Sequence, residues 1–216
     1  LGITEFKDFP LHELVDYIDW TPFFQTWELA GRFPKILEDE IVGAEATKLF
    51  KDALEMLQQI ISEKWLQASG VVGLWPANAV GDDVELYTDE DRKTVLSEVH
   101  TLRQQSKKAD GVPNIALADF VAPKDTGLRD YMGGFAVTAG LGVEKKLAQF
   151  KADHDDYHSI LLKALADRLA EAFAEKLHEI VRRLIWGYEE GEELTNEELI
   201  KEKYRGIRPA PGYPAC

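Results

Sequence analysis

The segment that most constrains the fold is residues 153–186, the longest periodic stretch in the chain. Its apolar residues recur at the spacing of one helix face and predict a long amphipathic helix. They are Leu161, Leu165, Leu169, Ala172, Phe173, Leu177, Ile180, Val181 and Leu184. A second pattern of the same period covers residues 38–66. The fold must therefore accommodate two long helices, each with an apolar stripe.

Between these helices the apolar pattern changes to one typical of strands. Residues 71–76 and 84–87 predict two strands joined by a turn-rich hairpin over residues 78–83. Residues 114–122 and 130–138 predict two more, and the first of these is nearly all apolar, which favours a central position. Strands in hairpins and pairs, with long helices between them, indicate an α+β fold with a mainly antiparallel sheet.

Shorter elements are marked by signals at their ends. Residues 1–20 are expected to be irregular except for a short helix over 11–17, and Thr21-Pro22 begins another short helix. Acids at 89–91 and lysines at 107–108 predict a helix across that span, because this arrangement suits the helix dipole. Thr195 and Glu198 form a capping box that opens a final short helix.

The composition excludes several classes of function. The net charge of −14 disfavours nucleic acid and anionic membranes as partners, and no window is long and apolar enough to span a membrane. A single cysteine excludes a disulfide framework and a cysteine-only zinc site, and it fits a reducing cytosol. The chain is long enough for one large domain, expected over residues 1–216. The absence of an initiator Met and the abrupt end suggest a fragment of a longer polypeptide.

The usual catalytic and nucleotide-binding motifs are missing. His154 and His158 have metal-ligand spacing on a helix face, but the glutamate of the HExxH motif and a third ligand are absent. A solvated helix start is the favoured interpretation, and a metal-dependent hydrolase is a minor alternative. The glycines form neither a dinucleotide nor a nucleoside-triphosphate loop, and there is no nucleophile elbow.

The C-terminal tail, residues 208–216, combines one arginine with three prolines and a glycine. Prolines fix the backbone in an extended form, which leaves carbonyl groups without helix or sheet partners. Those carbonyls could bind a ligand, and Arg208 offers a planar fork for a carboxylate or phosphate. The alternative is a proline-rich tail that covers the edge of a domain.

Two acidic residues could complete a site for a small molecule. Asp19 lies among aromatic residues just before a helix, where it could bind an ammonium group or only cap the helix. Glu171 lies among alanines, which could leave a smooth surface for a ligand or serve helix propensity alone. Together with Arg208, the two acids would complement a zwitterionic amino acid or a sulfonium ion.

Several long and unusual blocks of sequence occur in order over nearly the whole chain. The blocks are YIDWTPFF at 17–24, LEDE at 37–40, GVVGLWPAN at 70–78, LADFVAPK at 117–124, HDDY at 154–157, KALADRLAE at 163–171 and GIRPAPGYPAC at 206–216. Together they strongly resemble the C-terminal activation domain of cobalamin-dependent methionine synthase.

This resemblance implies a fold and a function. The family fold is a curved, mainly antiparallel sheet with long flanking helices. The complete enzyme transfers a methyl group from methyltetrahydrofolate to homocysteine through cobalamin, which is held by another module. The activation domain binds S-adenosylmethionine and supports reductive remethylation of oxidised cobalamin, with flavodoxin or another reductase as electron donor. A cytoplasmic methyltransferase of methionine biosynthesis is therefore expected.

The resemblance also implies which residues bind the ligand. Asp19, Glu171 and Arg208 match the two acids and the arginine of the family site, while Ala210 and Tyr213 match tail positions that line it. Arg208 would hold the methionyl carboxylate and the acids would serve the amino group. Tail carbonyls and Tyr213 would contact the nucleoside. No catalytic residue and no metal ligand is implied.

The chain differs from the family in one respect, because the family continues past the end of this chain. The domain is therefore expected to be incomplete at its C-terminus, and the fragment is not expected to catalyse the full reaction. The alternative is a docking domain for the cobalamin module or a reductase that binds no ligand in this form.

Overall fold

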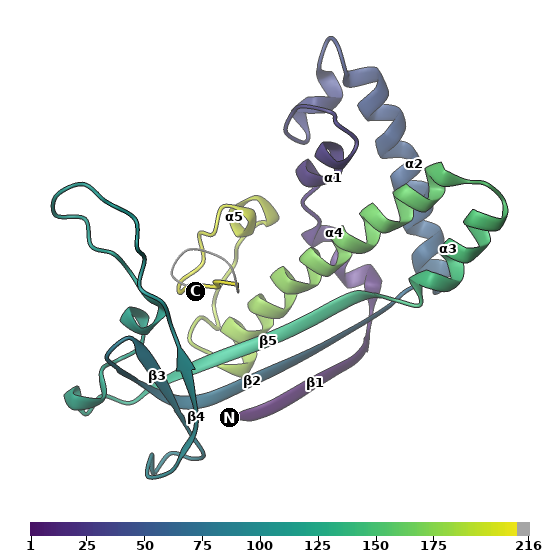
Figure 1. Cartoon of the computed structure of the whole chain (residues 1–216). Coiled ribbons are helices and arrows are strands. Elements are labelled where there is room, and N and C mark those ends of the chain that lie inside the picture. The colour runs from purple at the N-terminus through teal and green to yellow at the C-terminus, as the bar shows by residue number, and fades with distance from the viewer. Residues whose placement is uncertain (211–216) are drawn as a thin grey trace. The chain divides into compact units, whose positions relative to one another are not determined.

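The computed structural model describes residues 1–210 and contains five strands and five α-helices in that range. The strands are β1 (Gly2–Phe9), β2 (Gln67–Val80), β3 (Asp83–Tyr87), β4 (Val95–His100) and β5 (Asp130–Leu141). The α-helices are α1 (Thr21–Thr26), α2 (Gly43–Ser62), α3 (Val143–Ala152), α4 (Asp156–Ile180) and α5 (Asn196–Ile200) (Figure 1). The strand order is β1-β2-β3-β4, and β5 also pairs with β2.

The chain divides into two compact units, and each of β1, β2 and β5 contributes residues to both. Unit 1 contains residues 1–4, 71–135 and the tail from residue 206, and unit 2 contains residues 5–70 and 136–205. The described strand pairs β2–β3 and β3–β4 are antiparallel. The predicted α+β class with a mainly antiparallel sheet is therefore confirmed.

Unit 1 is built around the β2–β3 hairpin. Ala79 lies opposite Val84, which in turn lies opposite Val99 of β4. The small core contains Ala77, Ala79, Val84, Leu86 and Ala118, with Trp75, Val99, Val121 and Met132 packed against it. Because most of these side chains are small, polar contacts also hold the segments that cover the hairpin.

The buried amide of Asn78 is the centre of those polar contacts. Its Nδ2 donates to the carbonyls of Ala122 and Leu128, each at 2.9 Å, and its Oδ1 accepts from Arg92 at 2.7 Å. The Arg92 guanidinium also donates to the carbonyls of Ala77 and Asp130. One amide and one guanidinium thus join β2, β5 and the loop between β4 and β5.

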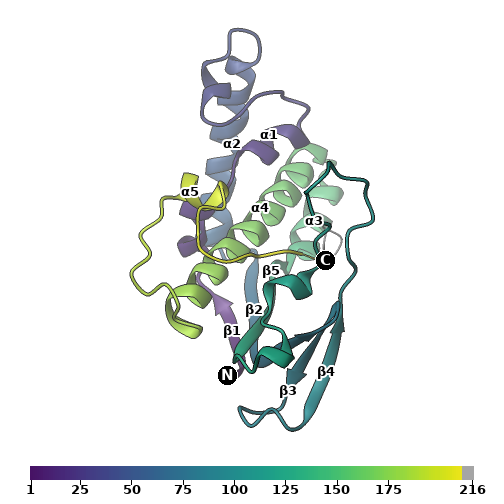
Figure 2. The same ribbon diagram turned by 90° about the vertical axis from the view of Figure 1, so that its left-hand side faces the viewer.

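Unit 2 is mainly helical, and α4 is its central element. One face of α4 is buried along its length, as the apolar stripe predicted. Helix α3 packs against α4 as an antiparallel neighbour, and α1 and α2 also contact it (Figure 2). Five aromatic side chains pack together beside α1 and α2: Trp20, Phe23, Phe24, Phe33 and Phe50. This packing holds the short N-terminal helices in place.

The sequence predicted one regular helix as far as Trp186, but the regular part of α4 is shorter. It ends at Ile180 and continues as a π turn, η5 (Val181–Ile185). The Trp186 N–H donates to the Val181 carbonyl, the i→i−5 bond that defines this wider turn. The second long helix is also shorter than predicted. The predicted pattern covered residues 38–66, whereas α2 covers Gly43–Ser62.

The predicted helix over residues 88–108 is wrong. Asp89 instead accepts a hydrogen bond from the Asp91 backbone at 2.9 Å, and Thr88 N–H donates to the Thr94 carbonyl, so the acids form a turn. Strand β4 follows this turn and pairs with β3. The order of acids and lysines suits a helix dipole, but residues 95–100 pair with β3 in the sheet, so no helix forms here.

The predicted central strand at residues 114–122 is also wrong. Ala116 N–H donates to Asp119 at 2.9 Å, and a 3-10 turn covers Leu117–Phe120. Ala116 and Ala118 are buried because the loop covers the hairpin core. The other strands are confirmed, because β2, β3 and β5 contain the predicted segments. The hairpin connection is shorter than the predicted residues 78–83: residues 78–80 and 83 pair within the sheet, and only residues 81–82 form the turn.

The N-terminal prediction is partly wrong, because residues 2–9 form β1 rather than an irregular segment. The short helix at residues 11–17 is confirmed as the 3-10 helix η1 (Leu11–Tyr17), and α1 begins at Thr21. The Thr195–Glu198 capping box is confirmed at the start of α5. Helix α3 was not predicted. Among residues 1–210, no helix is long and apolar enough to cross a bilayer.

Candidate functional site

Asp19 lies in the short connection between η1 and α1. Its Oδ1 accepts a hydrogen bond at 2.9 Å from the backbone N–H of Thr21, the first residue of α1, so the carboxylate caps this N–H although Trp20 occupies the N-cap position itself. The neighbouring Ile18 and Trp20 are buried, whereas Asp19 is only half-buried. No hydrogen bond from the described residues reaches its Oδ2. The capping role is thus present, and one carboxylate oxygen is available for a ligand.

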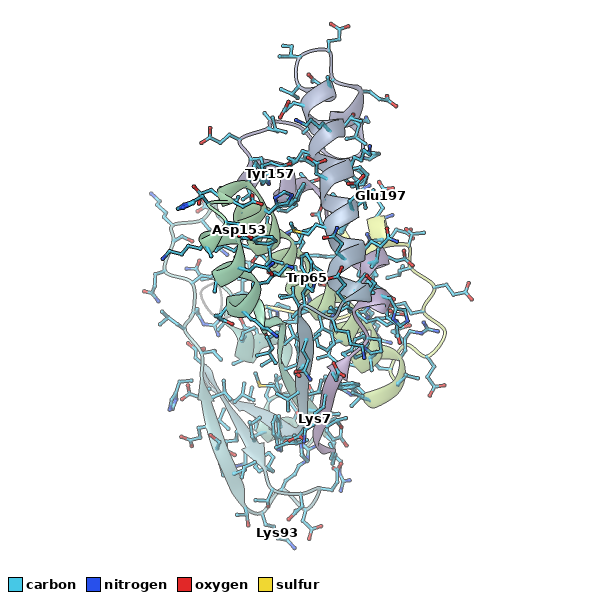
Figure 3. All side chains as sticks on the ribbon, turned by 90° about the vertical axis from the view of Figure 1, so that its right-hand side faces the viewer. Lys7, Trp65, Lys93, Asp153, Tyr157 and Glu197 are labelled. Carbon is cyan, nitrogen blue, oxygen red and sulfur yellow. The ribbon has the colours of Figure 1, made fainter. Side chains whose placement is uncertain are left out.

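The segment that carries Asp19 is attached to α4 at two points. Before Asp19, Tyr17 donates its hydroxyl hydrogen to Glu179 near the end of α4. After it, the ring of Trp27 contacts that of Tyr157, with centroids 5.2 Å apart. Tyr157 lies in the first turn of α4 (Figure 3). Asp19 therefore lies on a stretch of chain that runs along α4, in the direction opposite to the helix.

Glu171 lies on α4 between these two points of attachment. At about 1.5 Å per residue, it is about 12 Å from Glu179 along the helix axis. Its side chain is exposed, and no ion pair or hydrogen bond from the described residues involves it. Two of the predicted acids thus belong to unit 2, one on α4 and one on the segment beside it. Of the nearby alanines, Ala164 and Ala172 are buried, so packing uses part of the predicted smooth surface.

A polar cluster around Glu179 lies at the end of α4. Lys176 Nζ donates to the Tyr17 hydroxyl at 3.0 Å, and Arg183 donates to Glu179 at 2.7 Å. Burial alone would raise the pKa of Glu179, but hydrogen bonds from Tyr17 and Arg183 and the charge of Lys176 lower it overall. A hollow of about 160 Å³ lies beside this cluster, lined by Lys176, Glu179, Ile180, Arg183 and Leu184. It contains none of the predicted ligand residues.

Two of the predicted tail residues, Arg208 and Ala210, belong to unit 1. Residues 207–210 form neither helix nor strand, and they follow Gly206, whose φ of 96° favours glycine. Arg208 is half-buried and Ala210 is exposed. Tyr213 lies outside the described residues, so its place in the site stays a prediction.

The two histidines do not share a helix face. His154 precedes α4 with a left-handed φ of 56°, whereas His158 lies in the first turn of the helix. Asp155 caps α4 by accepting from the His158 N–H at 3.1 Å, and its second oxygen contacts His158 Nδ1 at 2.6 Å. Among residues 1–210, no group of three or more His, Cys, Asp or Glu side chains is arranged to hold a metal ion.

A buried polar cluster that was not predicted lies where α4 ends. Arg182 is fully buried and forms a two-pronged pair with Glu192, with Nε to Oε2 at 2.7 Å and Nη2 to Oε1. Its Nη1 contacts His178 Nδ1 at 2.7 Å. The sequence contained one signal for this cluster, because His178 and Arg182 lie at i, i+4 spacing beside the apolar stripe.

The chain was compared with known families and solved structures. The family model described as the activation domain of vitamin B12 dependent methionine synthase matches residues 10–216. Among solved structures, the crystal structure of the MetH reactivation domain bound to AdoHcy is similar to this chain at 60% sequence identity and a TM-score of 0.95. That similarity covers 100% of this chain and 66% of the other.

Proposed function

Because the chain belongs to the activation-domain family of vitamin B12-dependent methionine synthase, we propose that it binds S-adenosylmethionine and supports reactivation of the cobalamin enzyme. The observation that carries this proposal is the 60% identity to a reactivation domain described as bound to AdoHcy. AdoHcy is the demethylated form of the proposed ligand, so both share the amino-acid and nucleoside groups. No observation favours the alternative of a docking domain that binds no ligand.

We assign the ligand groups to residues by their chemistry. Arg208 would hold the carboxylate of the amino-acid moiety through its planar fork. Asp19 and Glu171 would serve the ammonium group, and both have carboxylate oxygens that no described residue uses. Ala210 and Tyr213 would line the side of the nucleoside. The two acids and the arginine thus match the charges of a zwitterion.

Capping and binding are compatible at Asp19. Its Oδ1 is fixed by the Thr21 N–H, and this bond orients the carboxylate before a ligand arrives. The second oxygen can then accept from an ammonium without loss of the cap. Such orientation reduces the entropy that binding must remove from the protein.

S-adenosylmethionine supplies a methyl group on a sulfonium, which is already activated for transfer. No general base is therefore required from this chain. Its residues would act by holding the ligand in one orientation, and positioning of this kind can contribute about 7 kcal/mol or more to lowering a barrier.

The wider activity is part of the same proposal. The methyl transfer from methyltetrahydrofolate to homocysteine would require the cobalamin-binding module and the other modules of a complete enzyme. The electron donor would be flavodoxin or another reductase, and the setting would be the cytoplasm. The chain by itself would provide the S-adenosylmethionine site and would not catalyse the full reaction.

Calorimetric titration of this chain with S-adenosylmethionine and with AdoHcy tests the proposal. We expect binding by the parent, and Arg208→Ala should weaken it by about 2–4 kcal/mol, because a charge-assisted contact is lost. Arg208→Lys keeps the charge but loses the fork and should give an intermediate loss. Arg129→Ala is the matched control, since Arg129 is an exposed arginine of the same unit.

Two outcomes would contradict the proposal. If the folded parent does not bind either compound at millimolar concentration, this chain does not provide the ligand site. If Arg208→Ala and Arg129→Ala bind as the parent does, Arg208 is not a ligand residue. A thermal shift provides a second readout, because a ligand at 100 times its Kd should raise stability by about 2.7 kcal/mol.

A further inference from the structure

The chain returns to the end of α4 just before it enters the tail that carries Arg208. The ring of Tyr204 contacts His178 edge to face, with centroids 4.7 Å apart. The Arg182 guanidinium lies over the same ring, with Cζ 4.5 Å from its centroid. Tyr204 is 8% exposed. Two residues of α4 and its π turn therefore enclose Tyr204.

Glu192 fixes the arginine that holds this ring. Arg182 is 0% exposed and the Glu192 side chain is only 7% exposed. The two-pronged pairing sets the plane of the guanidinium, and the contact with His178 occupies a third nitrogen. The cation–π contact with Tyr204 depends on that plane, so Glu192 orients Arg182 and Arg182 orients Tyr204.

A second set of contacts holds the next residue. The Tyr188 hydroxyl donates to the Arg205 carbonyl at 3.0 Å, and the Arg205 guanidinium pairs with Glu189 at 3.1 Å. The backbone of Glu189 is itself fixed, because its N–H donates to the Arg182 carbonyl at 3.0 Å. Side chain and backbone are thus held at consecutive positions, Tyr204 and Arg205.

We propose that Arg182, oriented by Glu192, is a positioning residue for Arg208. Two residues lie between Arg205 and Arg208, and the three steps along the chain span at most about 10 Å. If Tyr204 and Arg205 are held, the backbone of Arg208 must lie within that distance of Arg205. The inference rests on the proposed function for its effect on the ligand, but the restraint itself can be measured without a ligand.

The chemistry of the cluster favours positioning over simple stabilisation. Burial of an ion pair removes the hydration of both charges. For this reason, well-packed apolar residues at the same positions often stabilise a protein equally well. An apolar contact does not fix the plane of a group, whereas a two-pronged pair does. The arrangement therefore suits a part of the structure where orientation matters.

Backbone NMR relaxation and calorimetry on this chain test the inference. The test variants are Glu192→Gln, which weakens the two-pronged pair, and Tyr204→Leu, which removes the ring but keeps an apolar side chain. We expect the backbone order parameters of residues 206–208 and 210 to fall by about 0.2 or more in both variants, because a rigid backbone gives about 0.85 and a flexible one less than about 0.6. The Kd for S-adenosylmethionine should rise about tenfold, equivalent to about 1.4 kcal/mol.

Two controls separate positioning from general loss of stability. Arg183→Ala removes an arginine–carboxylate pair from the same π turn, but its partner Glu179 lies on α4 itself. Leu49→Ala removes a buried side chain of α2, so it should lower Tm without any contact to the cluster. Neither control should change the order parameters of the tail, and neither should change the Kd by more than about twofold, well below the tenfold step worth about 1.4 kcal/mol.

Each outcome decides one of the two proposals. If both test variants fold and the order parameters of their tails equal those of the parent, the positioning role is wrong, whatever the ligand does. If the order parameters fall but the Kd is unchanged, the cluster restrains the tail and does not position Arg208 for binding, which also overturns the inference. If the order parameters fall in the test variants and the parent fails to bind, the proposed function fails while the restraint stands.

Discussion

The hydroxyl of Tyr17 donates a hydrogen bond to Glu179, although 162 positions separate the two residues. Tyr17 is the last residue of η1 and Glu179 lies in the last turn of α4. Burial, followed by this hydrogen bond, raises the pKa of Tyr17. The contact fixes one side of the connection that carries Asp19, and it links the N-terminal segment to the helix that carries Glu171.

Tyr17→Phe should destabilise the chain by about 1.5–3 kcal/mol, because it removes a hydrogen bond to a mostly buried carboxylate. Urea unfolding would measure the loss. Tyr157→Phe is the matched control, since Tyr157 also donates to a carboxylate, that of Asp52, but at an exposed site. A smaller loss is expected there, and equal losses in the two variants would contradict the importance assigned to the buried contact.

Asp19→Asn should separate the two roles of Asp19. Asparagine caps helices about as well as aspartate, so the bond from the Thr21 N–H and the stability of the chain should change by less than about 0.5 kcal/mol. Binding of S-adenosylmethionine should weaken by about 1–3 kcal/mol, because the ammonium group loses an opposite charge. Calorimetry and thermal unfolding would measure the two effects.

The comparison with Asp19→Ala completes that test. Alanine removes cap and charge together, so stability should fall by about 1 kcal/mol in addition to the loss of binding. If the asparagine variant binds as the parent does, the carboxylate acts only as a helix cap.

Asn78→Asp should be strongly destabilising, by about 2–4 kcal/mol. The substitution replaces the donor that bonds the Ala122 and Leu128 carbonyls with a negatively charged acceptor. The control is Gln105→Glu, which makes the same chemical change where an exposed amide donates to the Arg103 carbonyl. Urea unfolding should detect at most about 0.5 kcal/mol in the control. Similar effects in both variants would show that the Asn78 contacts matter little.

The pair of Arg103 and Asp119 predicts a pH dependence of unit 1. Hydrogen bonds from Arg103, then from the Ala116 backbone, lower the pKa of Asp119 from 3.8 to about 2. An acid whose pKa is lowered by folding stabilises the folded state. This stabilisation is complete above the pKa of the unfolded chain and is lost as the pH falls through the pKa of the folded chain. The contribution of Asp119 should therefore disappear between about pH 4 and about pH 2.

Comparison with Asp119→Asn would measure that contribution, because asparagine does not titrate. The parent should have the higher unfolding midpoint at neutral pH, and the difference should narrow as the pH falls below about 4. A difference that stays constant down to about pH 2 would show that the ion pair does not set the acid response.

The sequence predicted those elements whose signals are local or strongly periodic. Helix α4 has an apolar stripe over its whole length, and the α5 capping box lies within four consecutive residues. The β2–β3 hairpin has two apolar segments on either side of a short turn. In each case the interactions that form the element involve residues close together in the sequence, so the pattern contains the information.

Elements whose pairing or packing partners the sequence pattern does not reveal were predicted wrongly or not at all. Strand β4 forms because it pairs with β3, and residues 88–94 turn back to permit this. Residues 114–122 are apolar because they cover the hairpin core, and periodicity cannot distinguish such a cover from a strand. At the candidate site, the cap at Asp19 was foreseen as an alternative, whereas the Arg182 cluster depends on Glu192 and Tyr204 and was missed.

The π turn at Val181–Ile185 has a consequence for how this segment can change in length. In a regular helix each residue advances the direction of the side chains by about 100°. The π turn holds one residue more than a regular turn, so deletion of one residue within it would restore the regular hydrogen-bond spacing and leave the side chains after it close to their present directions. Arg182 and Arg183 now occupy opposite environments, one buried and one exposed. Loss of one residue other than Arg182 from this turn should therefore be tolerated better than loss of one residue from the regular part of α4, where every later side chain would rotate.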